Sequence, residues 1–201
     1  MSDPSSSALD WESRYQEGRT GWERPAANPA FLAWRTSGAL SPCRILVPGA
    51  GRSAEPEALA EAGFSVVVVD AAESAVAAQR TRLAAHAAEI VRADLLAWEP
   101  ERPFDAIYDQ TCLCALPPAV LPAYAERLHR WLRPGGTLFV LFMQTGRDDG
   151  PPFHCDLDAM RRLFPAPLWQ WPDALPETVP HPFGFAEQPA ALRRPDQGAK
   201  S

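Results

Sequence analysis

The sequence predicts a single α/β domain built on a parallel β-sheet. Its 201 residues suit one domain with one hydrophobic core. From residue 44 onward, short runs rich in β-branched residues alternate with longer alanine-rich segments, which is the pattern of βαβ units. Hydrophobic residues make up 46% of the chain and charged residues 22%. This composition is typical of a globular protein that folds by burying apolar surface.

The strands are expected wherever a short apolar run meets turn residues or acids. Residues 45–47 form the first buried strand, and residues 65–69 form the second between Gly63 and Asp70. The remaining strands of the core are expected at residues 89–92, 104–108 and 137–143.

The segments between the strands predict helices. In residues 117–131, apolar side chains fall on one stripe, Pro117 and Pro118 occupy the opening turn, and residues 133–136 end the helix. The expected helices are residues 55–62, 74–88, 117–131 and 156–164. Beyond Pro165 prolines are too dense for long elements, so only short strands are expected, near residues 168–171 and 183–187. The single domain 1–201 thus has an N-terminal segment (1–40), a core (44–164) and a proline-rich end (165–201).

Charge and composition exclude several classes of partner. The formal net charge is −6, and no basic run exceeds two arginines, so neither nucleic acid nor an anionic membrane is an expected partner. No apolar stretch reaches membrane-spanning length, and the polar, acidic start is unlike a signal peptide, which predicts a cytoplasmic protein. The four cysteines show no zinc spacing, so no metal site is expected.

The residues that follow the strands predict a ligand site. In an open parallel sheet, ligands bind beyond the carboxyl ends of the strands. Gly49 and Gly51 follow the first strand, Asp70 the second, Asp94 the third and Asp109 the fourth. The glycines let the backbone approach a ligand, and Asp70 can accept both ribose hydroxyls of an adenosine. Asp109 can equally cap the segment that follows it.

Local charge favours a cationic ligand in this site over a dinucleotide. A dinucleotide places its pyrophosphate on a helix N-terminus, but Glu55 occupies the first turn of the first predicted helix. S-adenosylmethionine carries no phosphate and has a positive sulfonium. The acidic rim, together with the glycine turn, therefore predicts S-adenosylmethionine rather than NAD.

Four stretches, in order along the chain, resemble the thiopurine S-methyltransferase family, and within it the shorter bacterial and plant thiol and halide methyltransferases. They are residues 11–15 with Gly18, Thr20 and Trp22, residues 47–52, residues 104–111 with 114–116, and residues 150–153. The resemblance implies a Rossmann-like class I methyltransferase, with a seven-stranded, mostly parallel sheet and helices on both faces. It also implies that the aromatic N-terminus is a lid over S-adenosylmethionine. Aromatic faces attract a sulfonium.

The resemblance and the strand-end pattern together give the candidate donor site. Its expected residues are Trp11, Tyr15, Trp22, Gly49, Ala50, Gly51, Asp70, Ala71, Ala93, Asp94, Leu95, Asp109 and Gln110. Trp22, Trp34 and Phe153 are expected to shape the acceptor pocket, and His154 is either a general base or a plain loop residue. Gln110 replaces the arginine of thiopurine enzymes, and Phe153 the tyrosine of plant halide and thiol enzymes.

The sequence therefore predicts a methyltransferase that transfers a methyl group in line to a small soft nucleophile such as a thiol or selenol. Two alternatives remain, an NAD-dependent oxidoreductase and a non-catalytic S-adenosylmethionine-binding protein. Methylation of nucleic-acid bases is disfavoured, because residues 109–112 lack the Asn/Asp-Pro-Pro-aromatic motif that usually follows the fourth strand in such enzymes. No feature of the sequence indicates the oligomeric state.

Overall fold

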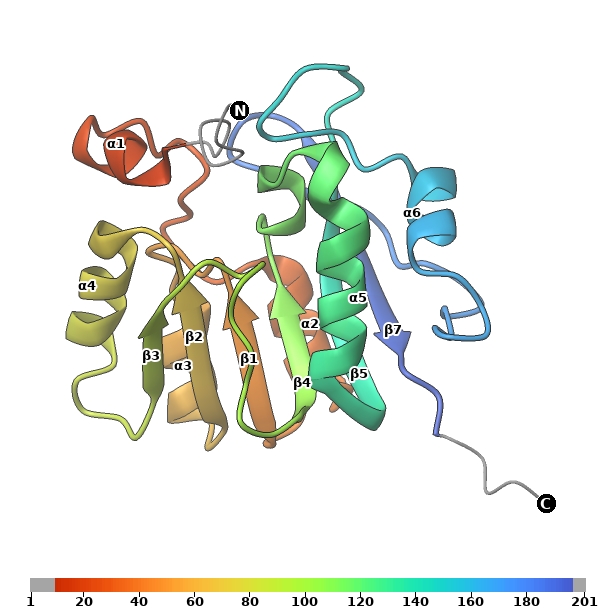
Figure 1. Ribbon diagram of the computed structural model, residues 1–201, viewed down its shortest axis with the longest axis horizontal. Coiled ribbons are helices and arrows are strands. Elements are labelled where there is room, and N and C mark those ends of the chain that lie inside the picture. Colours follow the sequence, from red (N-terminus) through yellow and green to blue (C-terminus); the bar gives the residue numbers. More distant parts are fainter. Residues whose placement is uncertain (1–9, 197–201) are drawn as a thin grey trace, which may run out of the picture.

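A computed structural model describes residues 10–196, which form a seven-stranded sheet in the order β3-β2-β1-β4-β5-β7-β6 (Figure 1). The first five strands are parallel, and β7 and β6 are antiparallel to their neighbours. The strands are β1 (Arg44–Pro48), β2 (Ser65–Asp70), β3 (Glu89–Arg92), β4 (Phe104–Asp109), β5 (Leu132–Gln144), β6 (Val179–Pro180) and β7 (Ala186–Arg193). The predicted seven-stranded, mostly parallel sheet is confirmed.

Helices cover both faces of this sheet. In Figure 1, α2 and α3 lie behind the sheet, α5 lies in front of it, and α1 lies above the carboxyl ends of the strands. The helices are α1 (Trp11–Gln16), α2 (Pro29–Thr36), α3 (Glu55–Glu61), α4 (Glu73–Arg82), α5 (Leu121–Trp131) and α6 (Leu157–Leu163), with short 3₁₀ turns η2 (Leu113–Ala115) and η3 (Pro118–Val120). No helix within residues 10–196 is long and apolar enough to cross a membrane.

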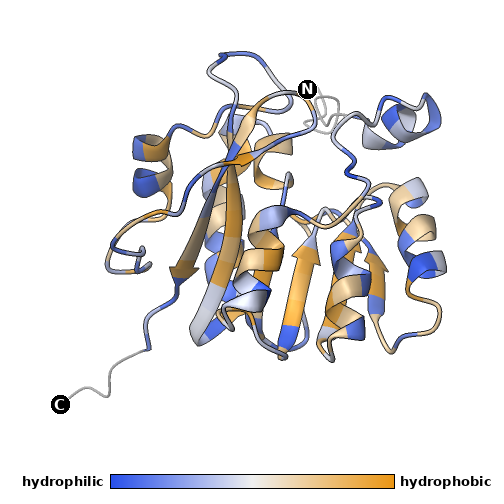
Figure 2. Cartoon of the chain, turned by 180° about the vertical axis from the view of Figure 1, so that it is seen from behind, coloured by the Kyte–Doolittle hydropathy of each residue, from blue (hydrophilic) through white to orange (hydrophobic). Residues whose placement is uncertain are grey.

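The hydrophobic core has two halves, one on each face of the sheet. Side chains alternate along a strand, so Leu46 faces α5 and α6 while Ile45 and Val47 face α2 and α3. Figure 2 shows the apolar strands between helices that carry hydrophilic residues as well. With both faces covered, the central strands are buried nearly throughout.

Two predicted helices differ from the structure at a boundary. The helix expected over residues 74–88 ends at Arg82, because the alanine-rich remainder must return the chain to the edge strand β3, which begins at Glu89. The helix expected from residue 117 begins as the 3₁₀ turn η3, and α5 itself starts at Leu121. Pro122 fits only the first turn of an α-helix, since it would clash with the preceding turn anywhere later.

The proline-rich end contains a longer strand than expected. Residues 168–171 form no strand, and only an isolated bridge joins Gln170 to Arg193. Residues 183–187, by contrast, lead into the eight-residue strand β7. Pro189 is tolerated in β7 because the two-residue β6 pairs only with Ala186 and Glu187, which leaves Pro189 at an open edge.

Candidate functional site

A cavity of about 610 Å³ opens above the carboxyl ends of β1, β2 and β4, beneath α1. Its volume lies in the range of small-molecule and cofactor sites. A recess of about 40 Å³ adjoins it and shares Tyr15, Trp22, Gly49 and Thr111 with the cavity. The strand-end rule therefore predicted the position of this cavity.

Asp70 joins the glycine turn to the end of β2 at the floor of this cavity. The carboxylate is 8% exposed and accepts N–H bonds from Gly51 and Ala72, each at 2.9 Å. Burial raises the pKa of Asp70, and the two N–H bonds oppose that rise. Each carboxylate oxygen keeps a second lone pair, so Asp70 can still accept hydroxyls from a ligand.

The glycine turn needs its glycines for conformation and for space. Gly49 and Gly51 have φ values of 55° and 54°, where residues with side chains are strained. A Cβ on Gly49 would lie 2.7 Å from the Cys112 sulfur, and one on Gly51 would lie 2.5 Å from the Tyr15 hydroxyl. The turn is therefore packed closely between the loop after β4 and Tyr15 of α1. From α4, the Gln79 amide donates to the carbonyls of residues 51 and 53, both at 3.0 Å.

Of the four acidic residues expected to surround the ligand, two line the cavity. Asp70 and Asp94 line it, whereas Glu55 lines only the small recess. The Glu55 side chain is 1% exposed and accepts the Asn28 N–H at 2.8 Å, and burial raises its pKa. Asp109 lines neither space.

Asp109 is a buried structural acid. It is fully buried, accepts the Leu113 N–H at 3.1 Å and the Tyr124 hydroxyl at 2.7 Å, and so fastens the loop after β4 to α5. Burial raises its pKa to about 6, and the Tyr124 hydroxyl opposes the rise. These contacts fit the alternative prediction, that Asp109 caps the segment that follows it.

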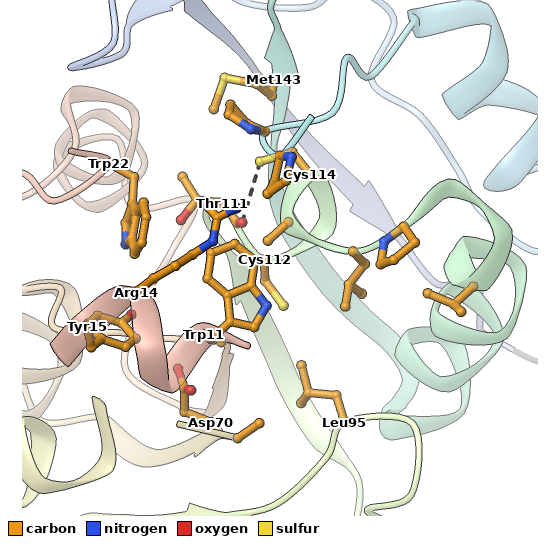
Figure 3. A pocket seen from close by; sticks show the side chains of 18 of the residues that line it. Trp11, Arg14, Tyr15, Trp22, Asp70, Leu95, Thr111, Cys112, Cys114 and Met143 are labelled. Atoms are coloured by element: carbon orange, nitrogen blue, oxygen red, sulfur yellow. Dashed lines mark hydrogen bonds between the residues drawn. The ribbon is translucent and has the colours of Figure 1, made fainter. Parts of the chain in front are cut away.

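Three aromatic side chains of the N-terminal segment stack together against the cavity (Figure 3). The Trp22 ring lies 5.5 Å from Trp11 and 5.8 Å from Tyr15, edge to face in both pairs. Glu12 fixes α1 onto α4 by accepting the Ser74 N–H at 2.8 Å and the Ser74 hydroxyl at 2.6 Å. All three aromatics line the cavity, as a lid would.

A buried ion pair ties the N-terminal segment to the C-terminal strands. Arg24, two residues after Trp22, lies 2.5 Å from the carboxylate of Glu187 on β7, with side-chain exposures of 13% and 0%. Arg24 also donates to the Pro180 carbonyl, and the Asn28 side-chain amide donates to Glu187 at 2.9 Å. Residues far apart in sequence thus close the cavity together, since His181 and Phe183 beside this strand pair also line it.

The structure brings most of the expected donor-site residues together. Those that line the cavity or its recess are Trp11, Tyr15, Trp22, Gly49, Ala50, Gly51, Asp70, Ala71, Asp94, Leu95 and Gln110. Ala93 packs against the core beneath the site instead.

The three other residues expected near the acceptor lie outside the cavity lining. Trp34 is buried under the sheet, where its ring packs on Tyr108 and Phe139. Phe153 and His154 do not line the cavity. His154 is exposed, and its Nδ1 accepts the N–H groups of residues 145 and 146, which are the contacts expected of a loop residue.

Several cavity residues escaped sequence reasoning, among them Arg14, Cys114, Met143 and Phe183. Arg14 could have been found, because residues 11, 14 and 15 share one face of a helix. Phe183 could not, since the proline-rich end carries no periodic signal that predicts its return to the site.

Comparison with known proteins gives consistent matches over most of the chain. The family model for thiopurine S-methyltransferase matches residues 6–171. A probable thiol methyltransferase 2 of Arabidopsis thaliana is 32% identical over 158 residues, which cover 76% of this chain and 70% of the relative. A thiopurine S-methyltransferase of Pseudomonas fluorescens (strain SBW25) is 32% identical over 174 residues, which cover 77% of this chain and 80% of the relative.

Solved structures share the fold at lower identity. A 1,6-didemethyltoxoflavin-N1-methyltransferase of Burkholderia thailandensis, with bound S-adenosylhomocysteine, superposes with a TM-score of 0.72 at 24% identity, covering 92% of this chain and 85% of that one. A magnesium protoporphyrin IX methyltransferase of Synechocystis PCC 6803 gives a TM-score of 0.70 at 14% identity, covering 90% and 94%.

Proposed function

The chain belongs to the thiopurine S-methyltransferase family, and from this premise we propose that it methylates a small soft nucleophile, a thiol, selenol or related group. It is a methyltransferase whose methyl donor is S-adenosylmethionine. The family assignment favours this activity over the NAD-dependent oxidoreductase and the non-catalytic binder that the sequence left open.

The residues present fit S-adenosylmethionine. When bound, the donor supplies a methyl group on a positively charged sulfur, already activated for displacement. Asp70, with free lone pairs at the cavity floor, would hold ribose hydroxyls, and Asp94 and Leu95 would lie by the base. The aromatic faces of the lid suit a sulfonium. The small recess, lined by Arg52 and Glu55, carries both charges that an amino-acid group requires.

The proposed soft acceptor is supported by the side chains on the opposite side of the cavity. Cys114 and Met143 lie there, across from Asp70 and Leu95 (Figure 3). Burial raises the pKa of Cys112 and Cys114, so both remain uncharged sulfur. Soft, polarisable walls suit a sulfur or selenium nucleophile, and a dry site holds it near the methyl group.

The histidine among the described lining residues, His181, is not set up to deprotonate the acceptor. His181 has its pKa lowered to about 4, mainly by burial, and its Nδ1 accepts the Phe183 N–H at 3.2 Å. Its free Nε2 therefore carries the ring proton and cannot take another. The chain's contribution is to bind, orient and exclude water, and the acceptor ionises without a protein base.

A panel of acceptors tests this proposal. The protein is incubated with methyl-labelled S-adenosylmethionine and separate thiols, selenols, halides, thiocyanate and amines, with Asp70→Asn as the donor-site control. Transfer to thiols or selenols that is lost in the control supports the proposal. Transfer to amines alone would contradict it. The acceptor is expected to be a small molecule, as the names of the matched relatives suggest.

A further inference from the structure

The side chain of Arg14 projects into the cavity without a carboxylate partner. It extends from α1 toward Thr111, between the rings of Trp11 and Trp22 (Figure 3). Within residues 10–196 no carboxylate lies within ion-pair distance of it, and its guanidinium carbon lies over the Trp11 ring, 5.2 Å from the ring centroid. A half-buried guanidinium inside a mostly apolar cavity calls for an anion.

The other cavity arginine is different in kind. Arg19 also lines the cavity, but it is exposed and pairs with Glu17. Its charge is already balanced and screened by water. Arg14 is therefore the cation of the lining available to a bound ligand.

The donor does not supply this anion. S-adenosylmethionine has one carboxylate, on its amino-acid group. The recess that suits this group contains Arg52, which is 36% exposed and forms only a long 3.7 Å ion pair with Glu23, whereas Arg24 in the same recess is paired with Glu187. Arg14 does not line that recess. It faces instead the part of the cavity near Thr111 and Cys114 (Figure 3), on the acceptor side. A charged acceptor remains as its partner.

We propose that Arg14 is a specificity-determining residue that binds the acceptor as a preformed anion and selects ionised acceptors over neutral ones. This inference rests on the proposed transfer to a soft nucleophile. A lone pair of the anionic sulfur forms the new bond to the methyl carbon, and the bond to the donor sulfur breaks with its electron pair remaining on that sulfur. No proton moves, and the anion and the sulfonium become two neutral thioethers.

The charge balance predicts which kinetic constant depends on Arg14. The guanidinium attracts the anion in the bound complex and also in the transition state, where the sulfur still carries much of its negative charge. The attraction disappears only when the sulfur becomes neutral, so Arg14 stabilises the bound acceptor and the transition state about equally. Removing it should raise KM with little loss of kcat. Arg14 also aids product release, because the neutral thioether product is no longer attracted to the guanidinium, which water can then solvate.

Arg14 also couples the acceptor to the lid. It lies on the same short helix as Trp11 and Tyr15, which face the donor. An anion held by Arg14 should therefore hold the lid closed over the donor. Such coupling is reciprocal. An anion should therefore raise the affinity for S-adenosylhomocysteine by the same factor by which S-adenosylhomocysteine raises the affinity for the anion.

Para-substituted thiophenols test the proposal, since they share one shape and differ in thiol pKa. Arg14→Gln is compared with Arg14→Lys and with Arg130→Gln, a control on the far side of α5. For members ionised at the assay pH, Arg14→Gln should raise KM about tenfold or more, equivalent to ~1.4 kcal/mol, with kcat within about twofold. Arg14→Lys should recover most of the affinity, and Arg130→Gln should match the wild type. An equal loss for neutral and ionised members would overturn the proposal.

The pH profile adds an independent measurement. For the wild type, the midpoint at which kcat/KM rises with pH should follow the acceptor's own pKa across the series. A midpoint that stays fixed for all acceptors would reveal a protein base and overturn the proposal.

Binding without turnover separates this inference from the proposed function. Thiocyanate is titrated by calorimetry into the protein saturated with S-adenosylhomocysteine. The wild-type complex should bind the anion, and Arg14→Gln should not. Failure of the wild type to bind overturns the role of Arg14, whereas failure of every acceptor to be methylated overturns the proposed function. If Arg14→Gln mainly weakens S-adenosylhomocysteine itself, Arg14 serves the donor and the inference is wrong.

Discussion

The buried ion pair between Arg24 and Glu187 offers the sharpest test of how the lid is held. Replacing Arg24 with methionine keeps an unbranched apolar stem but leaves the Glu187 carboxylate, which has no exposed surface, without its cation. Breaking a buried pair by removing one partner costs about 3–5 kcal/mol. The 2.9 Å bond from the Asn28 amide survives, so we expect a loss of about 3 kcal/mol in the free energy of unfolding.

This loss should depend on pH in a defined direction. Burial already raises the pKa of Glu187, and Arg24 opposes the rise. Without Arg24 the folded-state pKa rises further above the unfolded value, so the folded state favours the protonated acid. For such a group, stability is retained at low pH and is lost as pH rises through the folded-state pKa. Arg24→Met should therefore be less destabilised at pH 5 than at pH 8.

Urea unfolding followed by tryptophan fluorescence measures both effects. Arg24→Met is compared with the double variant Arg24→Met/Glu187→Gln, in which no buried charge is left unpaired and most of the lost stability should return. Arg130→Met is the matched control, because its partner Glu99 is 48% exposed and such surface pairs contribute about 0–1 kcal/mol. A cost below about 1 kcal/mol for Arg24→Met, or no recovery in the double variant, would refute the reasoning.

Two further predictions concern the lid and the buried acid of β4. Trp22→Ala removes the ring that contacts both Trp11 and Tyr15, and should weaken S-adenosylhomocysteine binding about tenfold in calorimetry, with Trp22→Phe losing less; unchanged affinity would argue against a lid. The pKa of Asp109 is raised from 3.8 to about 6 by burial, so the wild type should lose up to about 3 kcal/mol of stability as pH rises from 4 to 7. Asp109→Asn should lack this loss, and parallel stability curves for the two proteins would contradict it.

The sequence predicts the donor side well, because one physical rule applies there. Carboxyl ends of parallel strands meet at one edge of the sheet. Gly49, Asp70 and Asp94 each follow such a strand end, so they lie near one another. Asp109 also lies at the carboxyl end of its strand, but its side chain does not point toward the cavity. Side chains alternate along a strand, and Asp109 shares its face with Ile107, which is buried toward α5. Alternation within β4 would have pointed Asp109 into the core.

The acceptor side depends on long-range packing and resisted prediction. Helical spacing places Phe31 and Trp34 on one face of α2, but spacing does not reveal whether that face meets a ligand or a sheet; here it meets Tyr108 and Phe139. Phe183 reaches the cavity only because β7 pairs with β5 in antiparallel register. No local pattern within a proline-rich segment encodes such a pairing.

The charge argument for a sulfonium donor also takes a more specific form. Glu55 was expected to repel a pyrophosphate from the cavity rim, yet its side chain is buried at the start of α3 and is held by the Asn28 N–H. A pyrophosphate needs the free N–H groups of that helix end, and the Glu55 carboxylate in its first turn opposes a second negative charge there. Asn28 in turn donates its side-chain amide to Glu187. One residue of the N-terminal segment therefore links the acid at the start of α3 to the buried ion pair on β7.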